Sequence, residues 1–137
     1  MMASANLDLV RSIYAAWERG DFSHVEWAHP DIEYTAVDGL SPGTSRGIQA
    51  MGAYWREFVT DWSDFRAEAE EYRELDEERV LVLHRFSGRG RTSGIEVGPM
   101  GAKGACLFYV ANGKVTKLLL YSIRDRALSD LGLRGRR

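Results

Sequence analysis

The sequence predicts a single α+β domain in which helices pack on one face of an antiparallel sheet. Two observations predict it: apolar residues recur at helical spacing up to about residue 63, and β-rich segments separated by turn signals follow up to about residue 123. Helices followed by consecutive hairpins are typical of this class. A chain of 137 residues suits one domain. We expect one domain over 1–137, frayed at 1–5 and 134–137.

Three helices are expected in the first half. The first spans Asn6–Arg19 and ends at Gly20, and a short second helix spans His24–Ala28. The third runs from Gly47 to about Ser63. Its apolar stripe, wide enough to face a core, consists of Ile48, Met51, Tyr54, Trp55, Phe58, Val59 and Trp62.

Five strands are expected. Residues from Asp31 to Asp38 alternate as in a strand, and the turn formers of Gly39–Ser45 indicate an exposed loop. Further strands are expected at about 65–75, 79–92, 102–111 and 114–123, with turns at 76–78, 98–101 and 112–113, and a closing helical turn at 124–131. The Asn112-Gly113 turn is the strongest signal, because this dipeptide readily adopts the positive φ angles of a two-residue hairpin.

Composition excludes several classes of protein. The net charge is −2 and basic residues are mixed with acidic ones, so no nucleic-acid partner is expected. Cys106 is the single cysteine, which excludes an intrachain disulfide and favours a cytoplasmic location. The sequence holds no apolar run of membrane-spanning length, so no membrane association is expected.

Seven short motifs stand in order at 19–22, 27–34, 46–47, 80–83, 88–94, 112–115 and 124–133 and span nearly the whole chain. Together they resemble the nuclear-transport-factor-2-like superfamily, in particular its SnoaL-like branch. The resemblance implies a cone-shaped, strongly curved antiparallel sheet wrapped around the N-terminal helices, which is a cystatin-like α+β barrel with a cavity at its open end. Members of this superfamily include ketosteroid isomerases, polyketide cyclases and proteins that only bind partners, so the fold leaves the chemistry open.

Comparison with ketosteroid isomerases assigns Asp38 to the position of their catalytic base. The same comparison places Ile13 and Cys106 where those enzymes carry the tyrosine and aspartic acid of the oxyanion hole, so both donors are missing. Steroid isomerisation by that mechanism is therefore disfavoured. Tyr14, Tyr54 or His84 remain as donors from a different direction.

Asp38 and His84 are the candidate catalytic residues. His84 alternates with Val82 and Phe86, and the resemblance places this strand face toward the cavity. A carboxylate and an imidazole meeting in an apolar cavity suit proton abstraction next to a carbonyl group, with Asp38 as base and His84 as orienting partner or proton donor. The alternatives are a turn-capping Asp38, because Asp before Gly is common in turns, and a His84 that is only hydrogen-bonded in the core.

The candidate pocket residues are apolar or aromatic side chains on the faces assigned to the cavity. They are Ile13, Trp17, Tyr34, Tyr54, Trp55, Phe58, Val82, Phe86, Cys106, Leu118 and Leu120. No cofactor is expected, and no metal site, because the histidines lack metal-ligand spacing. The Gly88–Arg91 segment does not precede a helix, so a bulged strand is favoured there over a phosphate site.

Three functions stay open at this point. The first is an isomerase or cyclase that acts by acid–base catalysis on a small hydrophobic ketone or polyketide-like molecule. The others are a non-catalytic binding protein for an apolar ligand and a dimeric partner-binding module. A homodimer through the convex face of the sheet is expected, because Ala105, Leu107 and Tyr109 would otherwise form an exposed apolar patch.

Overall fold

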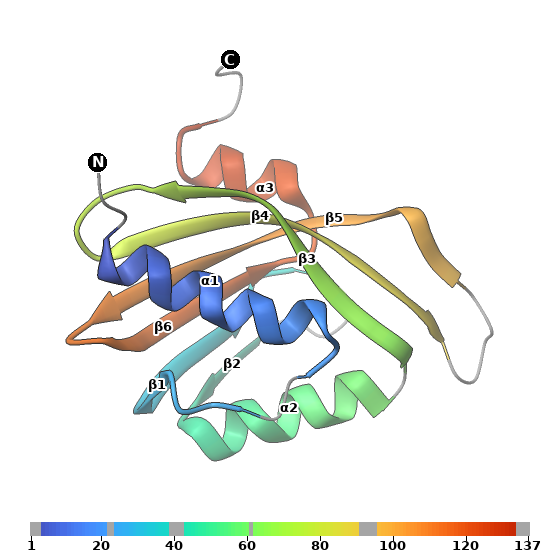
Figure 1. Cartoon of the computed structure of the whole chain (residues 1–137), viewed down its shortest axis with the longest axis horizontal. Helices are drawn as coiled ribbons and strands as arrows, with labels where there is room; N and C mark the ends of the chain where they lie inside the picture. The colour runs from blue at the N-terminus through green and yellow to red at the C-terminus, as the bar shows by residue number, and fades with distance from the viewer. Residues whose placement is uncertain (1–3, 22–23, 39–42, 61, 91–95, 134–137) are drawn as a thin grey trace.

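The computed structural model describes residues 4–21, 24–38, 43–60, 62–90 and 96–133, with side chains described outside 57–65 and 88–102. The helices are α1 (Ala5–Glu18), α2 (Ile48–Thr60) and α3 (Arg124–Asp130). The strands are β1 (Ala28–Ala36), β2 (Gly43–Arg46), β3 (Trp62–Glu74), β4 (Arg79–Gly90), β5 (Glu96–Ala111) and β6 (Lys114–Tyr121). They form one sheet in the order β2-β1-β6-β5-β4-β3, and α1 and α2 lie on the opposite side of it from α3 (Figure 1).

The predicted α+β class is therefore confirmed, with one change in strand direction. Neighbouring strands pair antiparallel except for β1 and β6, which run parallel, so the sheet is mixed. These two strands are far apart in the sequence, and no hairpin constrains their relative direction.

Helix α1 begins where a side chain caps it. The hydroxyl of Ser4 accepts a hydrogen bond from the Leu7 amide, 3.0 Å away, which satisfies one of the donors left free at a helix start. The helix then buries Val10, Tyr14 and Trp17 against the sheet. The predicted amphipathic helix is thus confirmed.

The hairpin between β5 and β6 also follows the prediction. Asn112 and Gly113 have φ angles of 53° and 78°, as a two-residue hairpin requires. The β4 strand carries an irregularity between Phe86 and Gly88, in agreement with the bulged strand expected near Gly88.

Three local predictions were wrong. Residues 24–28 form a turn and the start of β1 instead of a helix, because Ala28 already pairs with Val115 of β6. Part of the expected loop is β2, whose residues 43–46 pair with β1. The turn expected at 98–101 lies within β5. In the first case pairing with a strand distant in the sequence overrides the local preference.

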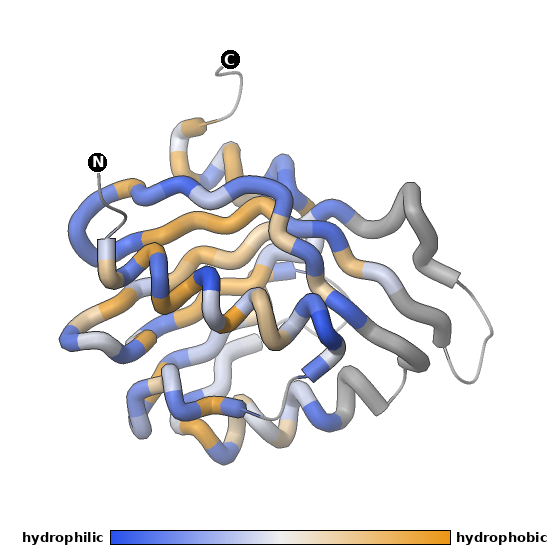
Figure 2. Tube along the Cα trace, viewed as in Figure 1, coloured by the Kyte–Doolittle hydropathy of each residue, from blue (hydrophilic) through white to orange (hydrophobic). Residues whose placement is uncertain are grey.

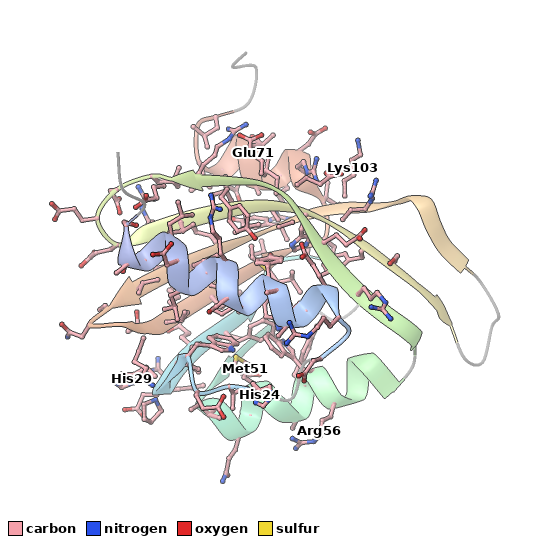
Figure 3. The ribbon with its side chains drawn as sticks, viewed as in Figure 1. His24, His29, Met51, Arg56, Glu71 and Lys103 are labelled. Atoms are coloured by element: carbon pink, nitrogen blue, oxygen red, sulfur yellow. The ribbon has the colours of Figure 1, made fainter. Side chains whose placement is uncertain are left out.

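The sheet separates two apolar clusters. The cluster on the α1 and α2 side, called here the concave cluster, takes side chains from both helices and from alternate positions of five strands, among them Tyr34, Val82 and Phe108. Figure 3 shows Met51 on the inner side of α2 and Arg56 on its outer side. In Figure 2 the middle strands are largely hydrophobic, whereas the edge strand β3 is hydrophilic, as suits an edge open to solvent.

The second cluster, called here the convex cluster, lies under α3. Ala105 and Leu107 are 0 and 1 % exposed because Ala127, Leu128 and the residues that follow cover them. The expectation that these side chains would form an exposed patch was therefore wrong, and only Tyr109 of that set is partly exposed. The homodimer stays a prediction that now lacks this argument.

Candidate functional site

His84 lies at the centre of the concave side, in β4 beneath α1. Its side chain is 0 % exposed, and Nδ1 lies 2.6 Å from the Tyr14 hydroxyl oxygen. The Phe86 ring packs against the imidazole, with ring centroids 4.3 Å apart. The other ring nitrogen, Nε2, has no hydrogen-bond partner in the described part of the chain. Buried polar atoms are rarely left so, and an unpaired one indicates a ligand or water.

Burial determines the charge of this histidine. Loss of solvent, reinforced by the nearby Arg124 guanidinium, lowers the pKa of His84 to about 3. The imidazole is therefore neutral at physiological pH and carries one ring proton. It can donate a hydrogen bond from one nitrogen and accept one at the other.

Asp38 follows the end of β1 and reaches across to the end of β6. Its Oδ1 accepts a hydrogen bond from the Ser122 amide, and its buried Oδ2 has no partner within the described ranges. Val37 packs into the convex cluster, so the alternation of the strand brings Asp38 to the same face as Tyr34. The carboxylate thus caps an amide, as the alternative interpretation held. That amide belongs to Ser122, directly after β6, and not to the turn that follows Asp38.

Strand register aligns Asp38 and His84 in one row across the sheet. Ala36 pairs with Leu120, and Leu120 with Cys106, so two residues further along Asp38, Ser122 and Gly104 stand side by side. Gly104 in turn pairs with His84. The two candidate catalytic residues therefore stand at the two ends of this row, with Ser122 and Gly104 between them, and their spacing in the sequence does not reveal it.

Gly104 makes room for this arrangement. A Cβ atom on Gly104 would lie 2.9 Å from Nε2 of His84, 3.2 Å from the Phe86 ring and 2.4 Å from the Tyr121 carbonyl oxygen. Nε2 of His84 thus lies over β5, and the Asp38 carboxylate reaches the end of β6, the next strand. Neighbouring strands are about 4.8 Å apart, so the strands that carry Asp38 and His84 are roughly 14 Å apart, and both side chains reach into the space between them.

Arg124 fixes the backbone around the row from the other side. Its guanidinium donates to the carbonyl oxygens of His84, at 2.7 Å, and Gly104, at 3.3 Å, and pairs with the Glu70 carboxylate at 2.6 Å. The same pairing lowers the pKa of Glu70. One side chain at the start of α3 thereby joins β3, β4 and β5 at the level of His84.

The predicted pocket residues belong to the concave cluster, with one outside the described side chains. Those buried there are Ile13, Trp17, Tyr34, Val82, Cys106 and Leu118, and those partly buried against it are Tyr54, Trp55, Phe86 and Leu120. The side chain of Phe58 lies outside the described residues. The Tyr34 hydroxyl is also buried, and the Trp55 side chain lies beside it.

The sequence analysis named Tyr14 only as an alternative donor, without its partner His84, and missed Gly104 and Arg124 as members of the site. Tyr14 is the neighbour of Ile13, the residue that the family comparison had aligned with a catalytic tyrosine. A useful signal was available for Tyr14, since a phenol in a buried helical stripe requires a hydrogen-bond partner. Nothing local marks Gly104 or Arg124, because their roles depend on strand pairing.

His24 and His29 lie on the α2 side of the molecule, apart from this row (Figure 3). His24 pairs with Asp21 and Glu26, and Nδ1 of His29 accepts from the Asp31 amide at 3.0 Å. Among the residues the structure describes, no three acidic, histidine or cysteine side chains come together as metal ligands. Within the same residues, no helix has the length and apolar character needed to cross a membrane.

Solved structures of similar fold come from several bacteria. An NTF2-like protein of unknown function from Burkholderia pseudomallei is 23 % identical, with a TM-score of 0.77 over 93 % of this chain and 97 % of that one. A protein of unknown function with a cystatin-like fold from Xanthomonas campestris is 21 % identical, with a TM-score of 0.69 over 84 and 88 % of the chains. A candidate polyketide cyclase from the same species is 18 % identical, with a TM-score of 0.69 over 85 and 89 %.

These structures share the fold, and their low identity carries no activity across. No curated protein matches the sequence. The model of the SnoaL-like domain family, however, matches residues 10–118, which include both Asp38 and His84. This chain is therefore a member of the SnoaL-like family of the NTF2-like superfamily.

Proposed function

We propose that the protein is an acid–base enzyme, an isomerase or cyclase, that removes a proton next to the carbonyl group of a small, neutral, hydrophobic molecule. The observation that carries this proposal is the pair of buried atoms without a partner in the described residues, Nε2 of His84 beside Gly104 and Oδ2 of Asp38 beside Ser122, in one row across the sheet. A carboxylate oxygen is a suitable base, and a neutral imidazole can donate a hydrogen bond to the developing enolate oxygen.

The surroundings support a neutral, hydrophobic substrate. The side chains of the concave cluster are uncharged, and many are aromatic rings in mutual edge or tilted contact, among them Tyr14, Trp17, Tyr34, Trp55 and Phe108. Burying a charged substrate group there without a partner would cost several kcal/mol. An aromatic or cyclic ketone of polyketide type fits these demands.

The test is deuterium exchange at the α-carbon of small, neutral cyclic monoketones in D₂O, followed by ¹H NMR with and without the protein. We expect accelerated exchange that falls about a hundredfold or more in Asp38→Asn, the scale of lost acid–base catalysis. The asparagine side chain introduced by this change keeps an oxygen for the Ser122 amide, so the fold should survive. The matched control is Asp8→Asn, an exposed carboxylate on α1.

Equal exchange rates in the wild type and Asp38→Asn would exclude Asp38 as the base. If the monoketones raise the melting temperature but their exchange is not accelerated, the non-catalytic binding protein becomes the better explanation, because a ligand that binds the folded state stabilises it in either case.

A further inference from the structure

The hydrogen bond between Tyr14 and His84 can be made in two ways. In one, the phenol donates to Nδ1 and the imidazole proton is on Nε2. In the other, Nδ1 carries the proton and donates to the phenol oxygen, which leaves Nε2 bare. Both side chains are 0 % exposed and the oxygen–nitrogen distance is 2.6 Å in either case. The tautomer determines whether Nε2 of His84 donates a hydrogen bond to a ligand or accepts one from it.

We propose that Tyr14 is a positioning residue that holds His84 in the tautomer with its proton on Nε2, so that the site accepts ligands that present a hydrogen-bond acceptor over Gly104. This deepens the proposed function and rests on it for the identity of the ligand as a carbonyl compound. The tautomer itself rests on the geometry of Tyr14 and His84 alone.

Donor and acceptor strengths favour this arrangement. A phenol is a far stronger acid than a neutral imidazole N–H, and the unprotonated imidazole nitrogen is the better acceptor. In the reverse arrangement the Tyr14 proton would need another acceptor, and the neighbouring polar atom is the Cys106 sulfur. A thiol is a weak acceptor, so the reverse arrangement loses one good hydrogen bond.

A second consequence concerns the ligand. An N–H group on Nε2 that is buried without a partner in the described part of the chain lacks an acceptor, which a carbonyl or enolate oxygen supplies. An ammonium group, the form that an aliphatic amine takes at neutral pH, would place donor against donor. We therefore expect a ketone to bind better than the amine of the same skeleton.

The tautomer can be read directly from the ¹⁵N chemical shifts of the imidazole nitrogens and their couplings to the ring protons. The measurement uses the uniformly ¹⁵N-labelled chain at pH 7, with His24 and His29 as internal references. We expect His84 to show a protonated Nε2 and an unprotonated Nδ1. The reverse pattern, or an imidazolium, would overturn the proposal, and neither result depends on any turnover.

Two variants test the role of Tyr14. Tyr14→Phe removes the donor, and we expect the Nδ1 resonance of His84 to shift and the preference for one tautomer to weaken. Tyr72→Phe is the matched control, because the Tyr72 ring packs edge-on against Tyr14, 6.1 Å away, and the hydrogen bond to His84 comes from Tyr14. An unchanged His84 spectrum in Tyr14→Phe would contradict the positioning role.

The two proposals fail separately. A protonated Nε2 without accelerated α-proton exchange would leave the tautomer standing and remove the enzymatic function. Accelerated exchange together with a protonated Nδ1 would leave the enzymatic function standing and remove the proposed tautomer. If Tyr14→Phe does not fold, Cys106→Ala is the second test, because it removes the alternative acceptor for the Tyr14 proton. An unchanged His84 tautomer in this variant supports the proposal, and a changed tautomer overturns it.

Discussion

The Tyr14 hydroxyl and Nδ1 of His84, 2.6 Å apart, form a fully buried hydrogen bond between helix α1 and strand β4. The two residues are separated by 70 positions in the sequence. Their contact gives the apolar core a polar link between helix and sheet, and it orients the imidazole with its other nitrogen over Gly104. Four further predictions concern the energetics of this region.

We expect His84 to make the protein less stable as the pH falls below about 6.5. The imidazole is neutral in the folded state down to pH about 3, whereas an unfolded histidine takes up a proton near pH 6.5. Between these two pH values the chain takes up a proton at His84 when it unfolds. The free energy of unfolding therefore decreases as the pH falls, by up to about 1.4 kcal/mol per pH unit. Above pH 6.5 this contribution is constant.

The measurement is the difference in unfolding free energy between wild type and His84→Asn from urea melts at pH 4–8. Tyr14, which faces His84, has its pKa raised further above this range by burial, and the titration of Glu70 affects both proteins alike. A difference that stays flat with pH would show that His84 is protonated in the folded state.

Asp38→Ala should destabilise the protein by about 1–3 kcal/mol, because it leaves the Ser122 amide without its acceptor. Asp38→Asn keeps that acceptor and should lose less than about 1 kcal/mol. Chemical denaturation of both variants measures the two losses. Equal losses would show that the hydrogen bond to Ser122 contributes nothing to stability.

Gly104→Ala should cost about 1–3 kcal/mol or more, since the added methyl group meets the Tyr121 carbonyl oxygen at 2.4 Å and Nε2 of His84 at 2.9 Å. The control is Gly52→Ala in α2, where the nearest atom is the end of the Arg56 side chain at 3.4 Å. That change should be neutral or stabilise by up to about 1 kcal/mol through helix propensity. Thermal melts compare the two, and equal effects would contradict the close packing at Gly104.

Trp17→Ala should cost about 3–5 kcal/mol, the range for truncating a large buried aromatic side chain. Trp17 is 4 % exposed, and its indole contacts the rings of Tyr14 and Trp55 at 4.8 and 5.1 Å. Trp55 is only partly buried, so its truncation should cost less. Urea denaturation gives both values, and a larger loss for Trp55 would reverse our assignment of the two side chains in the core.

The sequence by itself determined the periodic elements and their apolar faces. Helix α1, the Asn112-Gly113 hairpin and the orientation of His84 with Val82 follow from spacing and turn chemistry, because local sterics and burial of one face act within a few residues. The family resemblance added the curved sheet, which no local pattern contains.

Only the tertiary structure decided which groups meet. The parallel pairing of β1 with β6 brings Asp38 to the Ser122 amide, and the antiparallel pairing of β4 with β5 brings His84 to Gly104. Periodicity states which face a side chain occupies, but it does not state the strand that will lie beside it or the direction of that strand. The partners of Asp38 and His84 are therefore set by long-range register, which depends on the packing of the whole sheet.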